Sequence, residues 1–253
     1  MYPADRRIVL ALVAFVGGLF LTALVGGVVL SLGGYDLSVP ATLGSDAGRA
    51  AMQVAQGVPL DDLRAPAVIV ALLNLPLWIG LVAVPLLDRR RGLDWRRDLG
   101  WTVRPVDLPL GLAIGVTTQF ALVPFYELVW LFVDRRDVGA AAEALAATVD
   151  GPVDVVAFVA MTVIAAPVAE EIVYRGLLYR AIRDLRPWRS GVVVSVILSS
   201  LLFAMSHFQV VQFAGLFVFG AVAAVLFERT WRLATPIFAH VGFNAVTVVV
   251  LLS

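Results

Sequence analysis

Cysteine is absent from the 253 residues of this chain, which excludes disulfides, cysteine-type metal sites and thiol nucleophiles. Lysine is also absent, and all nineteen basic residues are arginines. Nineteen acidic residues balance them, and the resulting net charge of zero argues against a nucleic-acid partner. Charged residues make up only 15% of the chain, against about 25% in soluble domains. With 60% hydrophobic residues, the composition is typical of a polytopic membrane protein.

Long apolar segments account for most of the chain, and a membrane-spanning helix needs about 20 mostly apolar residues. We therefore predict an all-α transmembrane helix bundle with about seven spans, or eight if a further span or re-entrant segment is present. No soluble domain remains outside these segments, so residues 1–253 are expected to form one integral domain of the cell membrane. The expected spans are Ile8–Leu32, Pro66–Leu87, Val106–Val133, Val153–Ala181, Gly191–Ser206, Val210–Phe227 and Ala234–Leu252.

One apolar run and one polar stretch near the N-terminus are interpreted separately. The run Ile8–Leu32 is longer than the h-region of a secretory signal, about 7–15 residues, so we expect a retained first helix. The polar stretch Gly33–Ala65 is expected to be a loop or to carry a short amphipathic helix.

Arginines gather in alternate connections between the expected spans, and the intervening connections carry more acid than base. The positive-inside rule places arginine-rich connections in the cytoplasm. An odd number of spans then puts the N-terminus in the cytoplasm and the C-terminus outside. The arginines in question are Arg6 and Arg7 before the first span, Arg89, Arg90, Arg91, Arg96, Arg97 and Arg104 after the second, Arg183, Arg186 and Arg189 after the fourth, and Arg229 and Arg232 after the sixth.

Two adjacent glutamates, Glu170 and Glu171, follow an almost wholly apolar stretch in the fourth span. Ionisable groups at membrane depth cost roughly 2.5–3.5 kcal/mol each on insertion scales, so they commonly mark function. Glu171 and Arg175 have the i,i+4 spacing of a helical ion pair, whereas Glu170 has Tyr174 at that distance. We infer a structural Glu171 and a chemical Glu170. The alternative is that both glutamates begin a solvated face at the cytoplasmic end of the span.

The only two histidines, His207 and His240, also lie in apolar surroundings. His240 and Asn244 share one helix face at i,i+4 spacing, as a pair of donors that stabilise an oxyanion would. The alternatives are a hydrogen bond between helices for His207 and a polar clasp between helices for His240 and Asn244.

Three motifs taken together resemble the CPBP group of intramembrane proteases, which includes the type II CAAX prenyl endopeptidases and bacterial "Abi" relatives. The motifs are Glu170-Glu171-Ile-Val-Tyr-Arg175, then Phe203-Ala-Met-Ser-His207, then His240-Val-Gly-Phe-Asn244. Their order and spacing agree with the family pattern. They cover about the last hundred residues, so residues 151–253 are expected to be the catalytic core and residues 1–150 to be spans without motifs.

The resemblance implies a glutamate-type intramembrane endopeptidase that needs no cofactor. In that family the first glutamate and the first motif histidine activate a water, which here means Glu170 and His207. The second histidine and the amide, His240 and Asn244, would form the oxyanion hole, with Glu171 and Arg175 in support. The partners implied are the lipid bilayer and a membrane-associated protein or peptide, with a lipidated substrate as one form of it.

Rival functions use the same residues. A zinc protease could bind its metal through two histidines and a glutamate, although the chain lacks His-Glu-x-x-His. The chain also lacks the usual motifs of serine and aspartyl intramembrane proteases. A transporter, or a non-catalytic immunity or scaffold protein, would use the intramembrane polar groups for ion relay or helix contact.

The spans also predict where the site lies. Straight helices with these bounds would place Glu170 near the cytoplasmic third of the bilayer and His207 nearer the outer face. Because hydrolysis consumes water, we expect a polar cavity that reaches the site from the cytoplasmic side, where the arginines lie. The aromatic stretch with Phe213, Phe217 and Phe219 could line a lipid-accessible groove, but it is more typical of an ordinary lipid-facing surface.

Overall fold

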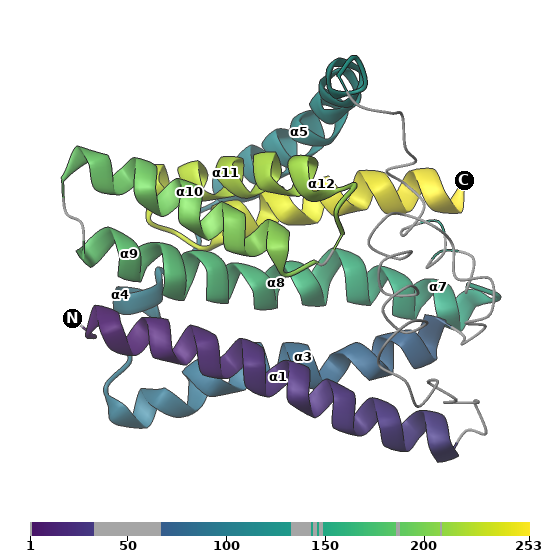
Figure 1. Cartoon of the computed structure of the whole chain (residues 1–253), viewed down its shortest axis with the longest axis horizontal. Helices are drawn as coiled ribbons and strands as arrows, with labels where there is room; N and C mark the ends of the chain where they lie inside the picture. The colour runs from purple at the N-terminus through teal and green to yellow at the C-terminus, as the bar shows by residue number, and fades with distance from the viewer. Residues whose placement is uncertain are drawn as a thin grey trace.

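A computed structural model of the chain describes residues 2–32, 67–132, 143, 146, 149–185, 188–207 and 209–253. Every regular element among these residues is a helix, which confirms the all-α prediction (Figure 1). The stretch Gly33–Ala65 lies outside the described residues. The long helices are α1 (Ala4–Leu32), α3 (Ala67–Leu87), α5 (Asp107–Val129), α10 (Arg189–Met205), α11 (Phe213–Thr230), α12 (Ala234–Leu252) and one continuous helix from Pro152 to Leu185.

Five helical segments are long and apolar enough to cross a membrane, which makes the chain an integral membrane protein. They are Ala4–Val25, Asp107–Val129, Pro152–Leu185, Phe213–Thr230 and Ala234–Leu252. Helix α10 is apolar but shorter than a full span. Each of the seven expected segments thus contains a helix, and the count of seven spans stays a prediction.

The continuous helix from Pro152 to Leu185 is the central element of the bundle. It consists of α7 (Pro152–Val159), η2 (Ala160–Ala165), α8 (Ala166–Glu171), η3 (Ile172–Tyr179) and α9 (Arg180–Leu185), and η2 and η3 are π-helical. Such wide turns inside α-helices occur frequently at functional sites. Here they flank the segment that ends in the two glutamates.

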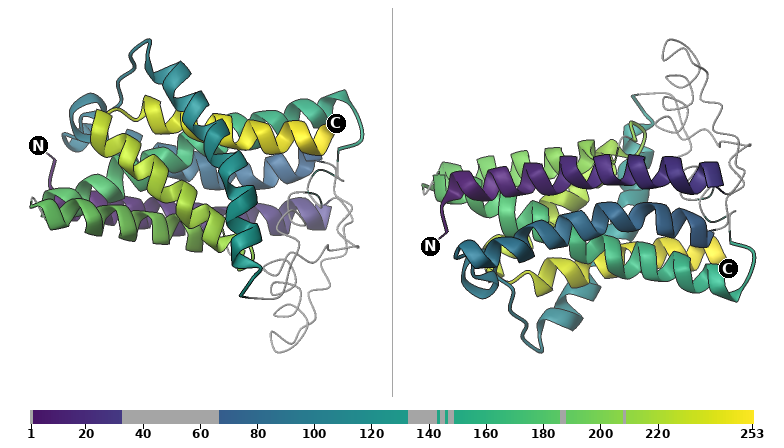
Figure 2. Two further views of the ribbon diagram at one scale, coloured as in Figure 1. Left: turned by 90° about the horizontal axis from the view of Figure 1, so that it is seen from above. Right: turned by 90° about the horizontal axis from the view of Figure 1, so that it is seen from below.

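The central helix lies between two groups of helices (Figure 1). Helices α1 and α3 pack together on one side of it, and α10, α11 and α12 lie on the other side. Helix α5 crosses α12 on the outside of the bundle, as the view from above shows (Figure 2). Helices of both halves of the chain therefore enclose α8 and η3.

Helices α5 and α12 approach each other so closely that only glycine fits at the crossing. A Cβ atom at Gly115 would stand 1.9 Å from the carbonyl oxygen of Ala239, and one at Gly242 would stand 2.8 Å from that of Leu112. Membrane helices associate without a hydrophobic driving force between them, so small residues that permit close packing largely determine their interfaces. The crossing sets the position of α12, and with it that of His240.

The arginine-rich end of the bundle is closed by buried polar contacts. Arg7 of α1 is almost fully buried and forms an ion pair with Asp184 of α9. Asp98 of the short helix α4 (Trp95–Leu99) accepts hydrogen bonds from the backbone N–H of Tyr2, at 3.2 Å, and from the side chain of Arg97, at 2.8 Å. Burial alone would raise the pKa of Asp98, but these hydrogen bonds outweigh it and hold that pKa well below its usual range. The start of α1, the end of α9 and α4 are thereby held together.

Replacing Gly115 by alanine should destabilise the protein by about 1–3 kcal/mol, because the added methyl group forces α5 and α12 apart. The matched control is Gly17→Ala in α1, where a Cβ would meet no described atom within 4 Å. Relief of the glycine entropy cost should make that control neutral or slightly stabilising. Thermal unfolding of the detergent-solubilised protein measures both. Equal melting temperatures for the two variants would contradict the close crossing.

Candidate active site

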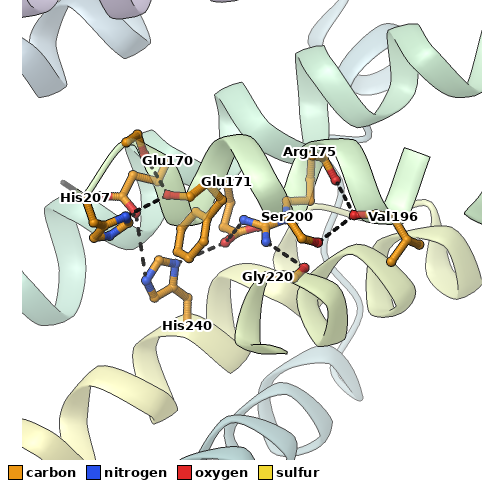
Figure 3. A network of polar contacts seen from close by, with 11 residues as sticks. Glu170, Glu171, Arg175, Val196, Ser200, His207, Gly220 and His240 are labelled. Atoms are coloured by element: carbon orange, nitrogen blue, oxygen red, sulfur yellow. Dashed lines mark hydrogen bonds and ion pairs between the residues drawn. The ribbon is translucent and has the colours of Figure 1, made fainter. Parts of the chain in front are cut away.

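The two adjacent glutamates at the end of α8 point in different directions, as consecutive residues on a helix must. Glu171 is completely buried, while 18% of the Glu170 side chain is exposed. Figure 3 shows Glu170 directed toward the two histidines and Glu171 directed toward Arg175. The local geometry thus separates the two carboxylates as their sequence spacing predicts.

Glu171 lies at the centre of a buried network. Its Oε1 atom accepts a hydrogen bond from Arg175 Nη1 at 2.7 Å, which confirms the ion pair predicted from the i,i+4 spacing. The same oxygen lies 3.0 Å from Nδ1 of His240, a contact between α8 and α12 that the sequence did not reveal. Arg175 also donates to the backbone carbonyl of Gly220 at 2.9 Å and lies over the ring of Phe203, 4.9 Å from its centroid. The network links α8, η3, α10, α11 and α12.

Glu170 faces both histidines without a direct hydrogen bond to either. Its Oε2 atom lies 3.9 Å from Nε2 of His207 and 4.0 Å from Nε2 of His240. Among the described residues this oxygen has no hydrogen-bond partner although it is buried. The three groups come from α8, from the turn after α10 and from α12, and they converge on one point.

The hydrogen bonds of the two histidines determine which ring nitrogen carries a proton. Nδ1 of His207 lies 2.8 Å from the carbonyl oxygen of Phe203, and Nδ1 of His240 lies 3.0 Å from the Glu171 carboxylate. Carbonyl and carboxylate oxygens accept, so both Nδ1 atoms donate. In each neutral ring, Nε2 is then the free base and faces Glu170.

The expected difference in depth between Glu170 and His207 is wrong, because the two side chains are 3.9 Å apart. The central helix continues to Leu185, so Glu170 lies 15 residues before its end, roughly 22 Å of helix. Helix α10 begins at Arg189, close to that end, and His207 follows 18 residues later, roughly 27 Å along. Both groups therefore lie at a similar distance from the arginine-rich end.

Asn244 lies one turn after His240 on α12 and borders the same cavity as the histidines. Its Nδ2 atom donates a hydrogen bond of 2.8 Å to the backbone carbonyl of Thr162 in η2. That bond uses one amide hydrogen and orients the side chain, and the second hydrogen is available to a ligand. Nothing in the sequence indicated that Asn244 would be held by a hydrogen bond to the backbone of a π-helical segment.

The aromatic stretch of α11 does not lie wholly on the surface. Phe219 is fully buried, its ring centroid lies 4.8 Å from that of His240, and it also packs against Phe243 at 4.3 Å. Phe203 packs against both histidines, at 4.7 Å from His207 and 5.6 Å from His240. These rings hold the imidazoles in place. The expectation of a lipid-facing surface is wrong for Phe219.

Glu170, His207, His240 and Asn244 all line one cavity of about 1060 Å³. The remaining lining residues come from α3, α5, the central helix, α11 and α12, together with Gln209. They are Asn74, Trp78, Gln119, Leu122, Val123, Tyr126, Glu127, Trp130, Phe158, Met161, Thr162, Ala166, Gln212, Gly215, Leu216, Phe219, Phe243, Thr247, Val248 and Leu251.

The cavity extends away from the arginine-rich end, toward the end where the C-terminus lies (Figure 1). The lining residues of α12, for example, run from His240 to Leu251 near its end, and none of those named lies in its first turn. The expectation that a cavity reaches the site from the arginine-rich side is therefore wrong. The buried residues of η3 fill the space on that side.

Among the described residues, no group of three histidine, aspartate or glutamate side chains is placed to hold a metal ion. Glu170, His207 and His240 do come together, and the separations of 3.9 and 4.0 Å are short enough for one water molecule to bridge Glu170 and a histidine.

These observations define a class: a helical membrane protein with a carboxylate, two imidazoles and an amide at one cavity. Residues 152–246 match the family model described as type II CAAX prenyl endopeptidase Rce1-like. This segment is therefore an Rce1-like type II CAAX prenyl endopeptidase domain of the CPBP/Abi kind, and its family is one of proteases. All three motifs lie within it. Among curated proteins and among solved structures, no match to the chain was found.

Removing the Glu171 carboxylate should cost far more stability than removing that of Glu170. Glu171→Ala leaves the buried Arg175 without its counter-ion, a change that typically costs about 3–5 kcal/mol. Glu170→Ala, at the adjacent residue, breaks no direct hydrogen bond of Oε2. The melting temperature of this variant should therefore be close to that of wild type. Melting temperatures in detergent measure the difference, and a Glu170→Ala variant that is the less stable of the two would contradict the assignment.

Proposed function

We propose that this chain is an intramembrane endopeptidase that hydrolyses a peptide bond with a water activated by Glu170 and His207. The observation that carries the proposal is the convergence of Glu170 Oε2 with Nε2 of His207, 3.9 Å away, in a large cavity. The Rce1-like domain at residues 152–246 supports the same reaction class. We also propose residues 151–253 as the catalytic core and residues 1–150 as supporting spans, in a bundle of seven spans.

Water activation follows from the geometry of the two bases. A water about 2.8 Å from each of two acceptors that are 3.9 Å apart forms hydrogen bonds to both. The lone pair of His207 Nε2 and the Glu170 carboxylate then polarise its O–H bonds, as general bases do. The hydroxide equivalent attacks the scissile carbonyl carbon, and the proton taken up is later given to the leaving amine.

His240 and Asn244 are proposed to stabilise the oxyanion of the tetrahedral intermediate. His240 takes up a proton on Nε2 from water in the cavity, after which it donates from Nδ1 to Glu171 and from Nε2 to the oxyanion, and the Glu171 carboxylate stabilises the resulting positive charge. Asn244 contributes its second amide hydrogen. Both donors are held before the reaction begins, by Glu171 and by the Thr162 carbonyl, so little reorganisation accompanies the charge that develops.

The proposed substrate is a membrane-associated protein or peptide. The family description names a CAAX prenyl endopeptidase, so a lipidated protein is one form that such a substrate can take. A cavity of about 1060 Å³ is large enough to admit a peptide segment rather than water alone.

Glu170→Gln and His207→Ala should each abolish peptide hydrolysis, at least about 10²-fold, because each removes a base from the attacking water. The matched control is Glu228→Gln, which removes a carboxylate outside the cavity that pairs with Arg183. Cleavage of membrane-anchored peptides by purified protein in detergent or liposomes measures the rates. Activity of a folded Glu170→Gln variant equal to wild type would refute the proposal, and loss of wild-type activity on chelation would favour zinc.

Asn244→Ala should lower kcat about 10²–10³-fold and leave KM nearly unchanged, since an oxyanion donor acts mainly in the transition state. Asn244→Leu keeps the approximate size of the side chain but removes the donor, so it should be equally impaired. An effect confined to KM would show that Asn244 binds substrate and does not stabilise the intermediate.

A further inference from the structure

The direction in which the cavity opens determines which substrates can enter. Starting from Glu170, its lining follows the central helix back toward Phe158, follows α12 forward to Leu251 and follows α5 forward to Trp130. Each of these three directions leads away from the end where α1 begins and where Leu185 ends the central helix (Figures 1 and 2).

On the opposite side of Glu170 the structure is filled. The eight residues of η3 are all buried, and Glu171, Arg175 and Phe203 occupy the space next to the histidines with no exposed surface. Beyond them, the buried Arg7 and Asp98 close the arginine-rich end. Among the described residues, no lining residue of the cavity belongs to this part of the bundle.

Polar side chains mark the open part of the cavity. Gln119 of α5 donates to Thr247 of α12 at 3.1 Å, and Gln212 and Glu127 lie further along the same wall. Trp130 stacks on Tyr126 near the end of α5, with ring centroids 5.7 Å apart, as aromatic residues at a membrane–water interface commonly are placed. Together these residues form a wall along which water can reach Glu170.

The charge distribution assigns the two ends to the two sides of the membrane. The filled end carries clusters such as Arg89, Arg90 and Arg91, whereas the connection between α5 and α7 holds four acidic residues and two arginines. The positive-inside rule places the arginine-rich end in the cytoplasm.

We propose that the active site opens to the extracytoplasmic side of the membrane, so that its substrates are peptide segments exposed at the outer face rather than cytoplasmic lipidated tails. The statement about substrates rests on the proposed function. The side from which the cavity is reached does not depend on catalysis. The same chain then has a cytoplasmic N-terminus and a site that water enters from outside.

The absence of cysteine makes the test direct, since each single cysteine introduced is the only thiol in the protein. Thr247→Cys and Gln212→Cys report on the cavity, Arg90→Cys on the exposed arginine-rich end and Ser199→Cys on the buried interior. Intact cells are treated with a membrane-impermeant maleimide, before and after permeabilisation. Labelling is then compared with that of the denatured protein.

In intact cells, both cavity cysteines should be labelled at least about tenfold faster than the cysteine of Arg90→Cys. Labelling of Arg90→Cys should become rapid only after permeabilisation. Ser199→Cys should react only after denaturation. The proposal is overturned if the cavity cysteines are protected until permeabilisation, or if Arg90→Cys reacts from outside. If the cavity cysteines are labelled from outside but the protein cleaves no peptide, the proposed function is refuted and the proposed orientation stands. Two cavity positions are used so that the test remains valid if one variant does not fold.

Discussion

The buried ion pair between Glu171 and Arg175 is the interaction on which the arrangement of the site depends. Two charges removed from water are stabilised only if their remaining hydrogen-bonding groups find partners. Several of these groups find partners on three other helices, in the imidazole of His240, the carbonyl of Gly220 and the ring of Phe203, whereas Glu171 Oε2 and Arg175 Nε are buried without a hydrogen-bond partner among the described residues. The requirement to satisfy one buried charge pair thus fixes the relative positions of α8, α10, α11 and α12. Glu170, which is adjacent in the chain, is left facing the cavity.

Much of this could be predicted from the sequence because its signals are local. Apolar length identified each helix, and the i,i+4 spacing identified the partner of Glu171 and the shared face of His240 and Asn244. The convergence of helices on Glu170 followed from three motifs considered together. These signals have in common that the spacing of residues within one helix determines the relative orientation of their side chains.

The remainder depends on how the helices are placed against one another, which spacing within a helix does not encode. Four extra residues at the end of the central helix, to Leu185, were enough to bring Glu170 level with His207. The hydrogen bond from His240 to Glu171 and that from Asn244 to Thr162 join residues more than sixty positions apart. The direction of the cavity likewise follows from the packing of α12 against η2 and α8 and of α5 and α11 against α12, not from the distribution of arginines along the chain.

The two π-helical segments carry an evolutionary consequence. A π-turn accommodates one residue more than the α-turn it replaces, and it can arise through a single inserted residue. Deleting one residue from η2 would leave every motif residue in place, yet it would rotate α7 relative to α8 and the rest of the central helix. A lineage could therefore lose or acquire this site through a one-residue insertion or deletion, and relatives that carry the complete motifs can differ in whether the catalytic groups meet.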